Sequence, residues 1–212
     1  MTATPPSRKS INQFRGQLSG GGMRPNIFEV LINFPGALAI VGLGHSATDF
    51  NNRIRFLCKA AALPASNISP IEVPFRGRSL KVAGDRTFDT WTVTVINDSD
   101  NYIRNQFEMW MSAIGQHQWH SGLQNPADYQ SDAIVWQLQR TPQGAGPANV
   151  IGLTTVPNEN VGATYRFQGI FPTNIGQIDL SYDQTDTIEE FTVEFQVNWW
   201  DRNNPSEVFL VG

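Results

Sequence analysis

Regular alternation of apolar and polar residues marks two stretches of this chain as strands. Within residues 187–201 every second position from 191 to 199 is apolar. The positions between are polar: Thr192, Glu194, Gln196 and Asn198. Residues 87–97 show the same period, with threonines on one side. A period of two is expected of a strand buried on one face. The predicted core positions of the two strands are Trp91, Val93, Val95, Phe191, Val193, Phe195, Val197 and Trp199.

Shorter apolar runs predict the remaining strands. We expect them in residues 26–34, at the start of 52–64 before a short turn, in 132–140, and on both sides of a Pro/Gly break in 164–182. Pro74 confines the extended segment around it to a sheet edge or a bulge, because proline has no N–H to donate.

One segment has helical rather than strand periodicity. Residues 98–100, Asp-Ser-Asp, offer N-cap side chains, and Gly115 ends the pattern. Between them the predicted packing face consists of Ile103, Phe107, Trp110, Met111 and Ile114. Many strands and one helix predict a mainly β fold with one α-helix (α+β), a barrel or sandwich of antiparallel strands on which the helix packs.

The chain is expected to hold one domain, residues 25–212. Residues 1–24 are rich in Ser, Gly and Pro and predict a flexible N-terminal arm. Residues 141–163, dominated by Gly, Pro, Asn and Thr, predict an extended loop.

Composition excludes several classes of protein. The net charge of −4 argues against a dedicated nucleic-acid binder, which needs a basic face. A single cysteine allows no disulfide within the chain, and no apolar stretch is long enough to span a membrane. We therefore expect a soluble protein made in a cytoplasm. Only 16% of the residues are charged, which is compatible with extensive self-association.

Candidate chemical motifs are weak. His45, Ser46 and Asp49 lie close together in the sequence, but no nucleophile elbow accompanies them. His117 and His120 have a spacing that zinc can use, but no second metal motif is found. Paired carboxylates could serve glycoside hydrolysis, but any domain with 19 acidic residues contains such pairs. We predict no catalytic residue, no metal site and no cofactor.

Two segments of opposite charge are more informative. The basic segment holds Arg76, Arg78, Lys81 and Arg86 around Asp85, and the acidic segment includes Asp183, Asp186, Glu189 and Glu190. One interpretation is that both are solvated or pair inside one subunit. The other is that they pair head-to-tail between copies, which generates rings or filaments. A tight turn is predicted at Gly84–Asp85.

Three blocks together give a resemblance to a known family. They are residues 55–98, with Arg-Gly-Arg and Gly-Asp-Arg-Thr-Phe before a Trp/Thr strand, the helix 103–114, and residues 167–200, where Phe-Pro-Thr-Asn-Ile-Gly precedes the acidic segment. In combination they resemble the tail tube protein of contractile-tailed bacteriophages, a family related to the type VI secretion tube.

The resemblance implies a non-enzymatic structural protein of the virion tail. Its subunits would form stacked hexameric rings, each subunit giving strands to one large barrel around a lumen, with the helix outside near the sheath. Implied partners are the tail sheath protein, baseplate and tail terminator proteins at the ends, and the tape measure protein and DNA in the lumen. Assembly would take place in the bacterial host cytoplasm.

Three alternatives remain open from the sequence. The chain could be a minor tube initiator or terminator, or the tube protein of a type VI-like contractile injection system. A small β-barrel binding module or esterase-like enzyme is the third, and the missing site disfavours it.

Overall fold

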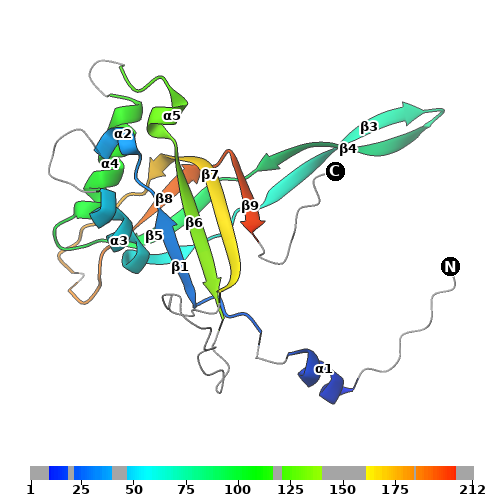
Figure 1. Cartoon of the computed structure of the whole chain (residues 1–212), viewed down its shortest axis with the longest axis horizontal. Coiled ribbons are helices and arrows are strands. Elements are labelled where there is room, and N and C mark those ends of the chain that lie inside the picture. The colour runs from blue at the N-terminus through cyan, green and yellow to red at the C-terminus, as the bar shows by residue number, and fades with distance from the viewer. Residues whose placement is uncertain are drawn as a thin grey trace, which may run out of the picture.

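Antiparallel strands dominate the computed structural model, which describes residues 10–18, 22–39, 47–116, 121–139, 161–183 and 185–203 (Figure 1). The strands are β1 (Phe28–Ile32), β2 (Cys58–Ala61), β3 (Ser66–Phe75), β4 (Arg78–Phe88), β5 (Trp91–Ile96), β6 (Ser131–Leu138), β7 (Val161–Ile175), β8 (Glu190–Gln196) and β9 (Trp199–Asn203). The helices are α1 (Ile11–Gln17), α2 (Gly36–Ala39), α3 (Ala47–Leu57), α4 (Tyr102–Ile114) and α5 (Pro126–Tyr129).

The main sheet is open. Its strand order is β1-β6-β7-β8-β5-β2, with β9 added beside β7. The first part of β7 pairs with β6 and β9, and its last part, from Phe171 on, pairs with β8. Gly169 lies between the two parts with φ 62°, a conformation that favours glycine, and a Cβ there would collide with the Asn198 side chain. The bent β7 therefore joins two halves of a sheet. Within the described residues its outermost strands, β1 and β2, each pair with a single strand, as β9 does.

The core lies where β5 and β8 pair side by side. Trp91 is opposite Phe195, and Val93 is opposite Val193, all four fully buried. The Trp91 ring stacks on Phe167 of β7 with centroids 4.5 Å apart. The predicted alternation of these two strands is confirmed from Trp91 to Val95 and from Phe191 to Val197.

Helix α4 covers this core, as the sequence predicted. Ile103, Phe107 and Trp110 are buried, and Met111 and Ile114 are partly buried at the rim. The indole Nε1 of Trp110 donates a hydrogen bond to the Tyr129 carbonyl at 2.7 Å, which ties α4 to α5. Figure 1 shows the helices α2 to α5 gathered at the end of the molecule opposite the β3–β4 hairpin.

The strand predicted at the start of residues 52–64 is wrong, because α3 occupies Ala47–Leu57 and only Cys58–Ala61 form a strand. Phe50 and Ile54 are both fully buried, at the i, i+4 spacing of a helix face. Phe56, which alternation would have placed inward, is 86% exposed. The mainly β class is confirmed, but the described chain holds more than the one predicted helix, and the sheet is not a closed barrel.

Two further expectations about strands need correction. No second strand follows Ile175 in residues 176–181, and β7 instead continues through Pro172 beside a register shift that tolerates proline. Trp199 is 42% exposed and does not belong to the core. The alternation ends after Val197 because the chain leaves β8 and crosses to pair with β7 as β9.

The predicted domain division stays a prediction. Within the predicted arm, Ile11–Gln17 form α1, whose N-terminus is closed by a capping box between Ser10 and Gln13 and which buries none of its residues. Of the predicted loop 141–163, the last three residues begin β7, and the others lie outside the described residues.

The structure of the core predicts that alanine substitutions of two phenylalanines differ strongly in their effect on stability. Phe195 contacts Trp91, Phe107 and Trp110 with ring centroids 5.4 to 6.2 Å apart. Phe195→Ala should lower the free energy of unfolding by about 3–5 kcal/mol, because it leaves a cavity among rigid aromatic rings. The matched control Phe56→Ala should change it by less than about 0.5 kcal/mol. Urea denaturation of both variants measures the difference, and equal effects would contradict the assigned core.

Candidate functional site

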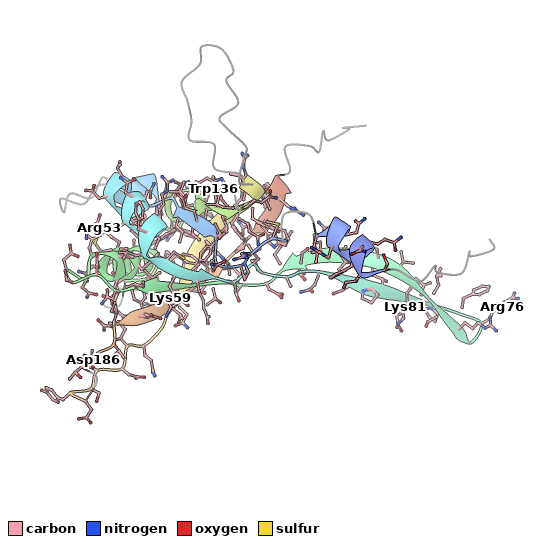
Figure 2. The ribbon with its side chains drawn as sticks, turned by 90° about the horizontal axis from the view of Figure 1, so that it is seen from below. Arg53, Lys59, Arg76, Lys81, Trp136 and Asp186 are labelled. Atoms are coloured by element: carbon pink, nitrogen blue, oxygen red, sulfur yellow. The ribbon has the colours of Figure 1, made fainter. Side chains whose placement is uncertain are left out.

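The β3–β4 hairpin projects from the body of the subunit (Figures 1 and 2). The two strands form a separate sheet and connect through Arg76 and Gly77, whose φ angles of 46° and 81° are both positive. Positive φ at both residues is typical of a two-residue type I′ turn, which suits the twist of a hairpin. The expectation that Pro74 lies on an edge strand is confirmed, because β3 pairs with β4 alone in this two-stranded sheet.

The tight turn predicted at Gly84–Asp85 is wrong, because both residues lie within β4. The pairing of β3 with β4 shifts register between Ile68 and Pro70, close to Gly84. A Cβ at Gly84 would come within 2.5 Å of the Ser69 carbonyl oxygen. Glycine is needed here for close backbone approach across the hairpin, not for a turn.

The hairpin holds the whole predicted basic segment. Arg76 is at its tip, and Arg78, Lys81, Asp85 and Arg86 follow along β4, all of them exposed. Lys81 Nζ lies 3.5 Å from Glu72 Oε1 of the paired strand. For the three arginines, no ion pair to an acidic side chain is found within the described residues. Their charges face solvent in a single subunit.

The acidic segment lies far from the hairpin. Figure 2 shows Asp186 and Arg76 at opposite ends of the molecule. Glu190 is held by Lys59, whose Nζ donates to Oε1 at 2.6 Å, and Glu189 Oε2 accepts a hydrogen bond from Asn97 at 2.9 Å. Lys59 and Asn97 were not predicted as partners, because they lie about a hundred residues away in the sequence. The two charged segments therefore do not pair with each other inside one subunit.

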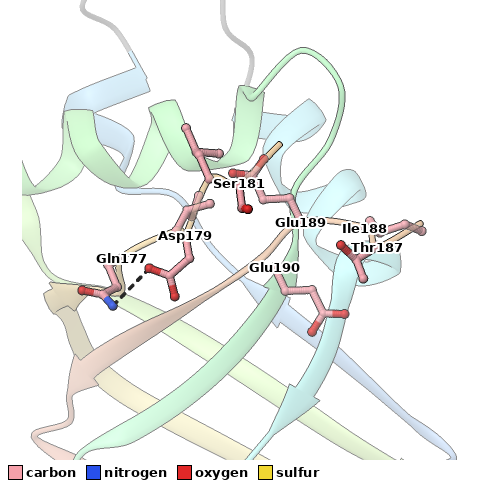
Figure 3. Close-up of a pocket in the computed structure, with 9 residues that line it drawn as sticks. Gln177, Asp179, Ser181, Thr187, Ile188, Glu189 and Glu190 are labelled. Carbon is pink, nitrogen blue, oxygen red and sulfur yellow. Dashed lines mark hydrogen bonds between the residues drawn. The ribbon is translucent and has the colours of Figure 1, made fainter. Parts of the chain in front are cut away.

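A recess of about 450 Å³ opens beside the acidic segment (Figure 3). Asp179, Glu189 and Glu190 contribute carboxylates to its lining, and Leu180 and Ile188 contribute largely exposed apolar side chains. Such a lining suits a side chain that is both apolar and positively charged. At the hairpin tip the guanidinium carbon of Arg76 lies 5.3 Å from the centroid of the Phe75 ring. A positive charge and an apolar ring are therefore adjacent at this tip.

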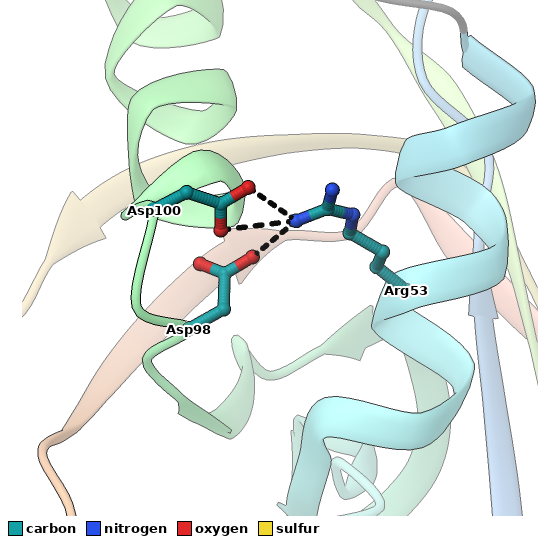
Figure 4. A network of polar contacts seen from close by, with 3 residues as sticks. All are labelled: Arg53, Asp98 and Asp100. Carbon is teal, nitrogen blue, oxygen red and sulfur yellow. Dashed lines mark hydrogen bonds and ion pairs between the residues drawn. The ribbon is translucent and has the colours of Figure 1, made fainter.

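A network around Arg53 joins one guanidinium to two carboxylates (Figure 4). Its Nη1 donates to Asp98 Oδ2 and Asp100 Oδ2, both at 2.8 Å. The hydrogen bond from Arg53 holds the pKa of Asp100 below its usual range, and the two carboxylates raise the pKa of Arg53. The guanidinium also lies 4.5 Å from the centroid of the Tyr102 ring. The network fastens α3 to the start of α4, which is a structural task.

No described group has the features of a catalytic or metal site. Burial raises the pKa of the Cys58 thiol to about 12, so little reactive thiolate forms near neutral pH. Asp49 is an exposed residue of α3, and His45, Ser46, His117 and His120 lie outside the described residues. The described part of the chain contains no cluster of His, Cys, Asp or Glu side chains that could hold a metal ion. Among the same residues, no helix is long and apolar enough to cross a membrane.

Sequence comparison shows which known proteins this chain is similar to. Residues 23–203 match the family model of the phage tail tube protein. The chain is 37% identical to the tail tube protein gp19 of Enterobacteria phage T4, over 86% of this chain and 93% of that relative. It is 28% identical to the tail tube protein of Serratia phage KSP90, over 88% and 93% of the two chains.

Solved structures share the fold at low identity. The sheath–tube complex of an extracellular contractile injection system, PVC, contains a chain that aligns with a TM-score of 0.53 at 10% identity, over 89% of this chain and 96% of that one. A chain of the tube-terminating cap of the anti-feeding prophage aligns with a TM-score of 0.52 at 14% identity, over 86% and 91%. The sequence matches carry the assignment: this chain belongs to the phage tail tube protein family and is a structural, non-enzymatic component of a contractile virion tail.

Proposed function

We propose that copies of this chain assemble into hexameric rings that stack into the hollow inner tube of the tail. The observation that carries the proposal is the open sheet, whose edge strands β1 and β2 pair on one side only. Unpaired strand edges favour association with further strands. When β1 or β2 of one copy extends the sheet of the next, the sheets of a ring join into one barrel around a lumen. The number six comes from the family resemblance.

Opposite charges at the two ends of the subunit support head-to-tail contacts. The basic hairpin of one copy meets the acidic segment of another, with Arg76 and Arg78 near Asp183 and Asp186. Lys81, Asp85, Arg86, Glu189 and Glu190 complete the proposed contact set. Exposed ion pairs contribute only about 0–1 kcal/mol each, so several pairs acting together are required. The contact should weaken as salt screens the charges.

An acidic subunit suits a conduit for DNA. The net charge of −4 gives phosphates no overall electrostatic attraction to the subunit, so the genome and the tape measure protein can pass through the lumen without sequence-specific binding. The sheath protein would surround the tube near α4, with baseplate and terminator proteins at its ends. Assembly would occur in the host cytoplasm. The similar solved chains come from a sheath–tube complex and a tube-terminating cap, which are assemblies of this kind.

The tube of a contractile injection system is a second candidate, and the shared fold of the PVC and anti-feeding prophage chains favours it. The much higher identity to the T4 tail tube protein favours the phage tube. A minor tube initiator or terminator would build only a single ring or a short stack.

Negative-stain electron microscopy of the purified full-length chain tests the assembly. We expect hexameric rings at low concentration and long hollow tubes at high concentration, because each ring exposes the surface that binds the next. A stable monomer at every protein and salt concentration would contradict the proposal. Rings that never stack would indicate a minor tube component.

Charge reversal tests the head-to-tail contact. Arg76→Glu with Arg78→Glu should reduce tube mass, measured by sedimentation at about 0.1 M salt, at least tenfold, because like charges then face each other. Adding Asp183→Arg and Asp186→Arg to the same chain should restore assembly. The single reversal Arg76→Glu should reduce tube mass more than the matched control Arg24→Glu, since Arg24 lies on neither charged segment. Unchanged assembly and folding of the double reversal would refute the contact.

A further inference from the structure

The hairpin has one apolar face that the other described parts of the subunit leave exposed. In its register Ile71 is opposite Val82 and Val73 is opposite Leu80, so these four side chains lie on the same face, with Phe75 next to them toward the turn. All five are between 45% and 68% exposed. We call this set the hairpin apolar face. The opposite face is more polar: Glu72 is paired with Lys81, and Pro74 with Ser79.

A two-stranded hairpin has little stability of its own in water. A contiguous exposed apolar patch usually marks an interaction surface. Because five apolar side chains project from a hairpin that itself projects from the body, the hairpin apolar face needs a partner.

Helix α1 presents a second uncovered surface. Ile11, Phe14 and Leu18 follow the i, i+3, i+7 spacing of one helix side, and they are 71%, 59% and 45% exposed. We call these three residues the α1 stripe. A seven-residue helix is too short to be stable alone even with its capping box, so it needs contact along the stripe.

The two surfaces match in size and chemistry. Seven helical residues extend about 10 Å, and the five residues 71–75 of a strand extend about 13–17 Å. Both surfaces consist of aliphatic side chains with one phenylalanine each. Figure 1 shows α1 apart from the hairpin in the same chain, although the two overlap in the projection of Figure 2. Each copy therefore presents both surfaces without joining them.

We propose that α1 of one copy packs its stripe on the hairpin apolar face of a neighbouring copy. Each copy gives one helix and receives another, so the contact repeats head-to-tail without limit, as a tube requires. The contact rests on the proposed self-assembly and adds a second, apolar contact that differs from the charge pairing. Because burial of apolar area does not depend on ionic strength as ion pairs do, it should persist when salt weakens the charged contact.

Chemical cross-linking between two variants tests the contact. One variant carries Phe14→Cys and the other Val73→Cys, and both sites are exposed, so neither change affects the fold. Cys58 is retained in both, because its raised pKa makes it a poor nucleophile. The two purified proteins are mixed in equal amounts, assembled and treated with a short bismaleimide. We expect a covalent dimer that contains one copy of each variant.

The matched control replaces Val73→Cys by Ser79→Cys, which is on the opposite face of the same hairpin, and the dimer yield should fall at least fivefold. Equal yields from the two faces, or no dimer in assembled material, would overturn the contact. A cross-link within one chain of a double variant, without dimers from the mixture, would show that α1 covers its own hairpin and would also overturn it. Microscopy of the same samples separates the hypotheses: tubes without the dimer refute only this contact, while the absence of both refutes the assembly as well.

Discussion

Unpaired backbone groups at the two edges of an open sheet are the constraint on which the structure depends. In a closed barrel every strand has two neighbours, but in the described part of the chain β1 and β2, at the two ends of the strand order, each have one. Peptide groups along these edges must bond to water or to another chain, and edges that stay bare are prone to uncontrolled pairing. In the proposed assembly these edges pair with strands of other copies. In that assembly the subunit is one section of a larger barrel.

The rigidity of the subunit comes from aromatic packing far from these edges. Trp91 and Phe195, opposite each other on β5 and β8, lie between the Phe167 ring and helix α4. The Arg53 network fixes α3 beside α4 through a partly exposed guanidinium and the largely buried Asp98 carboxylate. A body held in this way can carry a long hairpin at one end and an acidic segment at the other. Because the two charged segments lie at opposite ends of one subunit, the proposed contact joins them between copies.

Much of this architecture could be predicted from alternation alone. The inward residues of β5 and β8 and the buried face of α4 follow from periodicity, because burial on one side forces a regular pattern. The same reasoning failed at Ile54 and Phe56, where a short strand-like alternation lies within a helix. It failed at Trp199, because no local signal shows that the chain crosses from β8 to β9.

The sequence predicted only part of the candidate contacts. Charge clustering identified the basic and acidic segments, but their separation in space depends on the fold. The hairpin apolar face was missed because residues such as Val73 and Leu80 look like ordinary core positions until the structure shows them exposed. Gly84 was interpreted as a turn, since the sequence does not show that another backbone strand passes beside it.

Amide hydrogen exchange of dissociated subunits and assembled tubes tests the central claim most directly. In the dissociated chain, amides of β5 and β8 should exchange slowly, while those of β1, β2 and the hairpin 66–88 should exchange quickly, because they lack a second neighbour. Assembly should slow the exchange of β1, β2 and the hairpin at least tenfold and leave β5 and β8 almost unchanged. If the edges and the hairpin exchange equally fast in both states, the subunit does not complete its sheet through its neighbours and the account is wrong.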